Sequence, residues 1–295
     1  MDFTLKTYQN LIEALIKQGY CFQSFGEYIE KLPLLPSTSR IKFGTGSKGA
    51  SQHTKTRGRF PLGIKGSGGK EKQKTIILRH DVDKLPANSL RFAQIQHELG
   101  IKGSYYFRAV PGSWDENIIK EISSLGHEIG YHYECLTTTN GNIEKGIKDF
   151  ETNLNALRKL APVSTICMHG SPASKWDSKD LWKHYNYKDY GIIAEPYFDI
   201  NFDNVFYLSD TGRRWDGWKV SIRDKVPQQE QWAKDGLVFH NTMDIIKAVK
   251  TNKLPEQVMF TFHPQRWTDK ALPWIKELVL QNTKNVVKFF LNKMR

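Results

Sequence analysis

The stretch TIILRHDVD, residues 75–83, decides the fold of this chain. It begins with TIIL, an apolar run too short for a helix and typical of a strand buried on both faces. It ends in Asp81 and Asp83, whose side chains point the same way if the backbone stays extended, because successive residues of a strand alternate between its faces. The stretch therefore predicts a buried strand over 75–78 with two carboxylates at its exit. The same two acids would also suit a turn at the start of an ordinary loop.

Strands and amphipathic helices alternate beyond this stretch, with short connections between them. Such alternation is typical of an α/β fold with a mostly parallel sheet. The later strands are expected at residues 104–108, 128–133, 164–168, 191–194, 205–208, 237–239 and 258–262, and the helices at 88–99, 115–125, 143–160 and 272–293.

The chain of 295 residues divides into three predicted parts. Residues 1–33 are expected to form a short helical unit packed on the main domain, with helices over about 5–16 and 25–31. Residues 34–74 are Gly-, Ser- and Lys-rich and are expected to be a flexible basic insertion. Residues 75–295 form the main α/β domain.

The net charge of +12 is concentrated in one part of the chain, because residues 34–74 hold ten basic residues and one acidic residue. A nucleic-acid partner is therefore disfavoured, since a basic, Gly-rich segment is usually just solvated. No apolar run reaches the length of a membrane span, and the first residues lack the features of a secretory signal. The three cysteines give no disulfide framework. These features predict a cytoplasmic protein without a membrane span.

Histidines and acids gather at the predicted strand exits, where parallel sheets place their chemistry. His132 and Glu134 share a face at the end of one strand, His169 follows the next, and His263 ends a late strand. Each of these histidines taken alone is more often a structural hydrogen-bonding residue. Together, Asp and His suit a divalent ion such as Zn²⁺ with an open coordination position. A carboxylate base and a histidine acid beside it would complete a hydrolase for amides or esters.

Four motifs resemble the polysaccharide deacetylase (NodB-homology, carbohydrate esterase 4) superfamily: LRHDVD at 78–83, ELGIKGSYYFR at 98–108, GHEIGYH at 126–132 and FTFHPQRW at 260–267. The resemblance covers about residues 75–270. It implies a distorted, incomplete (β/α) barrel and a divalent metal, usually zinc, that serves to remove N-acetyl or O-acetyl groups from sugars. By position, it implies that Asp81 is the catalytic base, Asp83 and His132 are metal ligands, and His263 is the catalytic acid.

The chain departs from the family pattern at two places. The second metal histidine of the family would fall at Leu136, so the third ligand must come from elsewhere, and either His169 or Glu134 could supply it. His169 is preferred because a neutral imidazole restores the usual ligand set. The family's arginine motif after the fourth strand is also missing. The run Arg213–Arg214–Trp215 could supply an arginine and an aromatic platform, or could be a charged surface turn.

The main functional hypothesis is a metal-dependent hydrolase that removes an acetyl group from a sugar or polysaccharide precursor, which is nucleotide- or lipid-linked. The alternatives are a non-catalytic sugar-binding relative, suggested by Leu136, and another metal-dependent amide hydrolase. A carbohydrate is the predicted partner in the first two cases. Trp215 and Trp267 are candidates for stacking on a sugar ring, although aromatic residues more often belong to the core.

Overall fold

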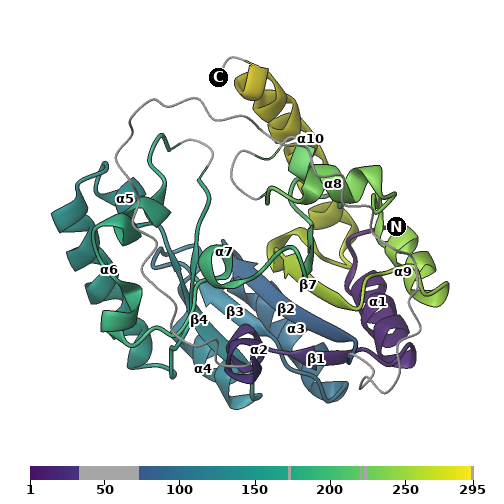
Figure 1. Ribbon diagram of the computed structural model, residues 1–295, viewed down its shortest axis with the longest axis horizontal. Coiled ribbons are helices and arrows are strands. Elements are labelled where there is room, and N and C mark those ends of the chain that lie inside the picture. Colours follow the sequence, from purple (N-terminus) through teal and green to yellow (C-terminus); the bar gives the residue numbers. More distant parts are fainter. Residues whose placement is uncertain (33–72, 172–173, 220, 222–224, 294–295) are drawn as a thin grey trace, which may run out of the picture.

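A curled parallel sheet forms the centre of the molecule (Figure 1). The computed structural model describes residues 1–32, 73–171, 174–219, 221 and 225–293. Within them the sheet has seven strands, which run in the order β5-β4-β3-β2-β7-β6 with β1 paired to β2, and every pair is parallel. The predicted α/β fold and the incomplete barrel implied by the resemblance are confirmed. The strands are β1 (Cys21–Gln23), β2 (Thr75–Val82), β3 (Ser104–Phe107), β4 (Glu128–Tyr133), β5 (Ile166–Met168), β6 (Phe206–Ser209) and β7 (Gln257–Phe262).

Strand β2 lies at the middle of the sheet, and all eight of its residues are buried. It continues four residues beyond the predicted 75–78, because its second half pairs with β3 while β7 covers its other edge. Ile76 and Leu78 belong to the larger apolar cluster, and Ile77 belongs to a separate, smaller cluster. Arg79 and Asp81 follow Ile77 on its face of the strand, since side chains alternate.

Helices flank the sheet, and several begin at a capping side chain. Thr4 caps α1, Asp115 caps α4 and Asn241 caps α9 by accepting hydrogen bonds from the first free backbone N–H groups. The described helices are α1 (Leu5–Lys17), α2 (Phe25–Lys31), α3 (Pro86–Glu98), α4 (Glu116–Ser124), α5 (Cys135–Thr138), α6 (Ile143–Arg158), α7 (Pro196–Asp199), α8 (Gln229–Lys234), α9 (Thr242–Lys250) and α10 (Ala271–Lys293), with short 3₁₀ turns at Ser178–Lys183, Tyr187–Tyr190, Gly217–Lys219 and Pro264–Arg266.

The N-terminal residues contribute more than the two predicted helices. Strand β1 lies between α1 and α2 and pairs with the first half of β2, on the edge that β3 leaves free. Tyr8 of α1 is fully buried, and its ring meets the Phe262 ring edge-on with the centroids 5.0 Å apart. The first residues are thus part of the sheet and of its core.

Two of the predicted strands do not form. Residues 191–194 make only an isolated bridge between Thr165 and Ala194, and residues 237–239 have no strand partner within the described chain. The apolar character at 237–239 has another cause, because the Phe239 ring packs against Phe206 in the core. Most of the predicted basic insertion, residues 34–72, falls outside the described residues. None of the described helices is both long and apolar enough to cross a membrane.

Candidate metal centre and active site

The carboxyl ends of four strands bring the predicted site residues together. Asp81 and Asp83 lie at the end of β2, His132 and Glu134 at the end of β4, His169 after β5, and His263 after β7. Asp210, which follows β6, joins them through a hydrogen bond with His263. Their meeting follows from the topology, because all strands of a parallel sheet end at the same edge.

Asp83 and two histidines form the centre of this group. The Asp83 Oδ1 atom lies 3.6 Å from Nε2 of His132 and 3.4 Å from Nε2 of His169. Asp83 Oδ1 is buried and has no hydrogen-bond partner, whereas Oδ2 accepts a hydrogen bond from Nε2 of Gln265 at 3.0 Å. A buried carboxylate oxygen without a partner is costly unless a cation or a donor satisfies it.

Each of the two histidines is oriented from behind by an acceptor. Nδ1 of His132 lies 2.9 Å from the Cys167 carbonyl oxygen, and Nδ1 of His169 lies 2.9 Å from Glu134 Oε2. Because these oxygens only accept, Nδ1 must carry the proton in both rings. Burial lowers the pKa of His132 to about 4, so this imidazole is neutral at pH 7 and its Nε2 presents a lone pair toward Asp83.

Glu134, the other candidate for the third ligand, is already engaged. Its Oε1 accepts hydrogen bonds from Nε and Nη2 of Arg108 at 2.9 and 2.7 Å, and its Oε2 accepts from Nη2 of Arg108 and from His169. Both oxygens therefore point at donors. This is the arrangement of a carboxylate that orients a metal-binding histidine. It favours His169 over Glu134 as a ligand.

Arg79 holds the predicted catalytic base. Its Nε and Nη2 donate to the two carboxylate oxygens of Asp81 at 2.8 and 2.6 Å, and both side chains are almost completely buried. Burial would raise the pKa of Asp81, but the charge of Arg79 outweighs it and the pKa lies below its usual range. Asp81 is therefore ionised at neutral pH. The sequence analysis did not predict this arginine, although its spacing of two residues from Asp81 places both on one face of β2.

His263 is held by Asp210, which the sequence analysis also missed. Nδ1 of His263 lies 2.5 Å from Asp210 Oδ1, and Asp210 also accepts hydrogen bonds from Nη1 of Arg266 and Nε1 of Trp267. Burial and Arg266 lower the pKa of His263, but the charge and hydrogen bond of Asp210 outweigh them, so the pKa is raised. The signal was present in the sequence, since Asp210 directly follows a strand.

The other predicted substrate residues are buried or engaged elsewhere, although Trp267 does touch this group through its hydrogen bond to Asp210. Trp215 and Trp267 are 2% and 0% exposed and pack in the core, so neither ring has a free face for a sugar. Arg213 donates to the Trp274 carbonyl oxygen and lies over the Trp274 ring. Arg214 pairs with Asp216. The arginine that engages Asp81 is Arg79 and neither of these two.

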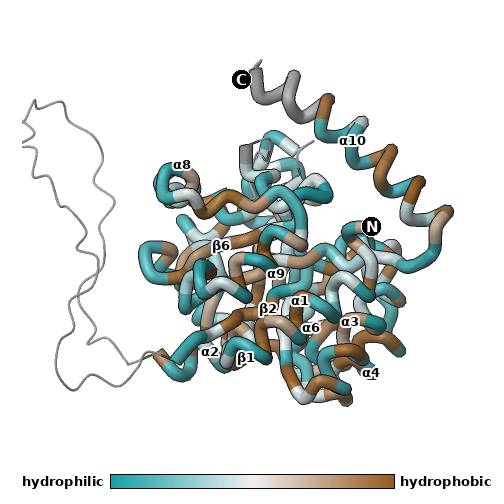
Figure 2. The backbone as a smooth tube through the Cα atoms, turned by 90° about the vertical axis from the view of Figure 1, so that its right-hand side faces the viewer, coloured by the Kyte–Doolittle hydropathy of each residue, from teal (hydrophilic) through white to brown (hydrophobic). Residues whose placement is uncertain are grey.

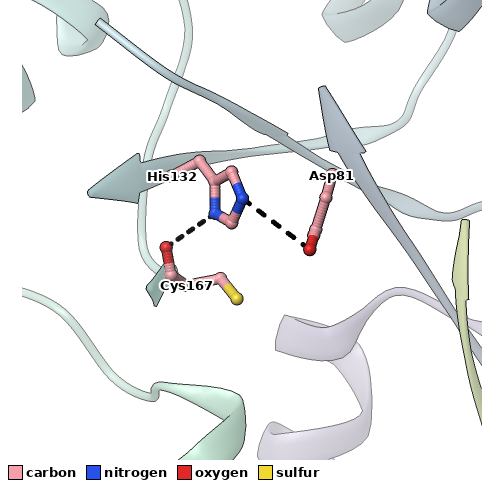
Figure 3. A group of neighbouring side chains, drawn as sticks. All are labelled: Asp81, His132 and Cys167. Carbon is pink, nitrogen blue, oxygen red and sulfur yellow. Dashed lines mark hydrogen bonds and ion pairs between the residues drawn. The ribbon is translucent and has the colours of Figure 1, made fainter. Parts of the chain in front are cut away.

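A second set of possible ligand atoms lies next to the first. One atom each from Asp81, His132 and Cys167 lie within 4.8 Å of one another, and Figure 3 shows the His132 ring between the other two residues. This set fits a cation poorly, because the buried guanidinium of Arg79 already neutralises Asp81 and would repel a second positive charge. The set of Asp83, His132 and His169 has a carboxylate oxygen without a partner and fits a cation better.

No protein-family model and no curated protein matches the chain. Among solved structures, it is similar to wild-type BA3943, a CE4 family pseudoenzyme from Bacillus anthracis, with 13% identity over 75% of this chain and 63% of that one, and a TM-score of 0.40. The chain thus spans less than two thirds of that protein.

It is also similar to Bacillus subtilis PdaA, a family 4 carbohydrate esterase, with 14% identity over 73% of this chain and 78% of that one, and a TM-score of 0.36. A third similar structure is the Bc1960 peptidoglycan N-acetylglucosamine deacetylase, with 16% identity over 75% of this chain and 85% of that one, and a TM-score of 0.37. All three bear names from the group that the sequence motifs resemble.

Proposed function

We propose that the protein is a metal-dependent hydrolase that removes an acetyl group from an N-acetylated, or O-acetylated, sugar. The observation that carries the proposal is the buried Asp83 Oδ1, which has no hydrogen-bond partner and faces Nε2 of both His132 and His169. Two imidazoles and one carboxylate are the donor set that Zn²⁺ prefers when it keeps an open position. Asp83, His132 and His169 would hold a zinc ion, which would supply Lewis-acid polarisation of an acyl oxygen.

Asp81 and His263 carry the proton transfers in this proposal. Asp81 is ionised, lies 3.7 Å from the same His132 Nε2 through its Oδ2, and takes a proton from the attacking water. His263 protonates the departing amine, and Asp210 keeps its imidazolium form stable through the hydrogen bond to Nδ1. This division of roles assigns a base and an acid to groups whose pKa values are shifted apart.

One observation favours the alternative of a non-catalytic sugar-binding protein. Arg79 engages both oxygens of Asp81 and holds the pKa of this carboxyl below its usual range, so Asp81 has a reduced tendency to take up a proton. A binding protein would not need Asp81 to act as a base. Both functions are compatible with a bound metal, so only turnover distinguishes them.

The test is acetate release from N-acetylated chito-oligosaccharides by the purified protein, before and after chelation and after zinc is added back. Release that is lost with the chelator, restored by zinc and absent in Asp81→Asn supports the hydrolase. Zinc binding and sugar binding without any acetate release support the alternative. Release that is insensitive to the chelator rules out the metal-dependent reaction.

A further inference from the structure

Helix α10 buries two polar side chains on its inner face and exposes several apolar side chains on its outer face. Glu277 and Gln281 on the inner face are buried, with 8% and 6% of their surface exposed. Leu272, Ile275 and Val279 on the outer face are 81%, 51% and 58% exposed. A surface helix of a globular protein normally has the opposite arrangement. Figure 2 shows α10 extending from the body with apolar segments along it.

Specific contacts fix this orientation of α10. The Glu277 carboxylate lies 3.5 Å from Nζ of Lys84, and Nδ2 of Asn285 donates to the Gly212 carbonyl oxygen at 2.8 Å. Nη1 of Arg213 donates to the Trp274 carbonyl oxygen, also at 2.8 Å. The inner face of α10 is therefore bound to the loops that follow β2 and β6, and the outer face is directed away from them.

The outer face forms a continuous stripe with cationic flanks. Leu272, Ile275, Val279 and Val286 recur at helical spacing and are more than half exposed. Lys276 and Lys284 beside the stripe are also exposed. The sequence of α10 has four lysines and one acidic residue, Glu277, which points inward. An apolar face bordered by lysines is the pattern of helices that lie in the interface of an anionic lipid layer.

We propose that this stripe of Leu272, Ile275, Val279 and Val286 binds an anionic lipid surface. The charge of α10 itself complements such a surface, because its four lysines outnumber its single acidic residue and each basic residue close to the lipid adds to the attraction. The same charge opposes a second copy of the chain as the occupant, since two copies paired along α10 would each bring an excess of lysines to the contact. In this arrangement α10 lies flat on the lipid headgroups.

Lipid binding through α10 would also bring the candidate active site close to the lipid surface. The inner face of α10 contacts Lys84, next to Asp83, and Gly212, two residues after Asp210. The carboxyl edge of the sheet would therefore lie close to the lipid surface. If the proposed function holds, and this step rests on it, the substrate is an N-acetylated sugar linked to a lipid.

The experiment measures cosedimentation with vesicles of phosphatidylcholine alone and of phosphatidylcholine with an equal amount of phosphatidylglycerol. The wild-type protein should bind the anionic vesicles far more tightly. The double variant Ile275→Glu/Val279→Glu should weaken that binding by about ten-fold or more, because burying even one such side chain is worth about that factor. Met243→Glu in α9, where Met243 is 59% exposed, is the matched control and should bind as the wild type does.

Several outcomes would overturn the lipid proposal. These are a wild-type protein that does not bind anionic vesicles, a double variant that binds them equally well, and a wild-type dimer in sedimentation equilibrium that the double variant dissociates. Acetate release from a soluble N-acetylated sugar should be the same in the double variant and the wild type. Loss of vesicle binding with retained release therefore separates this proposal from the proposed function.

Discussion

Arg79 holds both carboxylate oxygens of Asp81 from two residues earlier on the same strand, with N–O distances of 2.8 and 2.6 Å. The two residues are 1% and 3% exposed, so the pair is buried in the sheet. The Arg79 guanidinium also lies 5.3 Å from the centre of the Tyr197 ring. Because one strand supplies both partners, the base and its counter-ion are positioned together when β2 pairs with β3 and β7.

Replacing Arg79 should strongly destabilise the protein. Arg79→Met leaves the Asp81 carboxylate buried without its partner, and breaking a buried ion pair in this way costs about 3–5 kcal/mol. Urea denaturation should show a lower free energy of unfolding for Arg79→Met. The double variant Arg79→Met/Asp81→Asn should recover most of that loss, because it removes the uncompensated charge. An unchanged midpoint in Arg79→Met would show that the pair does not stabilise the fold.

Replacing Glu134 should weaken zinc binding although Glu134 is not a proposed ligand. Glu134→Gln removes the carboxylate that accepts the Nδ1 proton of His169, and the loss of such an orienting group typically reduces metal affinity by about 10–100-fold. His169→Ala should reduce the affinity further, because it removes a ligand. Competition with a chromophoric chelator measures both. An affinity that Glu134→Gln lowers more than His169→Ala would instead assign the ligand role to Glu134.

The pH dependence of acetate release should respond to Asp210. Asp210 raises the pKa of His263, and the proposed acid acts only when protonated, so kcat/KM should fall as the pH rises through this pKa. Asp210→Asn removes the charge that raises the pKa, and the alkaline limb should therefore move to lower pH. Profiles of kcat/KM for the two proteins test this shift. An alkaline limb at the same pH in both would exclude His263 as the group that it reports.

His127 should make the fold sensitive to acid. Its Nε2 lies 2.9 Å from the Ala93 carbonyl oxygen and its Nδ1 accepts from the Gly103 N–H, so the ring is neutral, and burial lowers its pKa to about 4. The unfolded chain binds a proton near pH 6.5 and the folded chain does not. The contribution of His127 to the free energy of unfolding is therefore fully present above pH 6.5 and is lost as the pH falls toward 4.

Between pH 6.5 and 4 the free energy of unfolding should fall by about 3 kcal/mol because of His127, as the size of its pKa shift implies. Urea denaturation as a function of pH measures it. His127→Gln should lower stability at pH 7 but should flatten this part of the profile. If the free energy of unfolding fell equally steeply with pH in the wild type and in His127→Gln, the role of His127 would be contradicted.

The sequence predicted the parts of the fold that depend on local periodicity. The alternating pattern located β2, β4 and β7, and the period of two placed Asp81 and Asp83 on one face. Strand β1 was missed because three residues carry little periodicity, and its pairing with β2 spans more than fifty residues of chain. The strand expected at 237–239 was wrong, because an apolar run near Phe239 also arises where a loop packs into the core.

The site was predictable where a side chain sits at a strand exit. The hydrogen-bond partners of those side chains could not be predicted, because they depend on which strands become neighbours in the sheet. Asp210 reaches His263 only because β6 lies beside β7, and the burial of Arg79 follows from its place at the middle of the sheet. Trp215 and Trp267 illustrate the opposite case, since sequence alone does not distinguish a core tryptophan from one that is free to stack on a sugar. The ligand role of His169 stays a prediction.

The most direct test of the metal centre is the anomalous scattering of crystals grown with zinc, measured on both sides of the zinc absorption edge. We expect one peak about 2.0–2.2 Å from Asp83 Oδ1, His132 Nε2 and His169 Nε2. A peak bound instead by Asp81 and Cys167, or no peak in fully zinc-equilibrated crystals, would contradict this expectation.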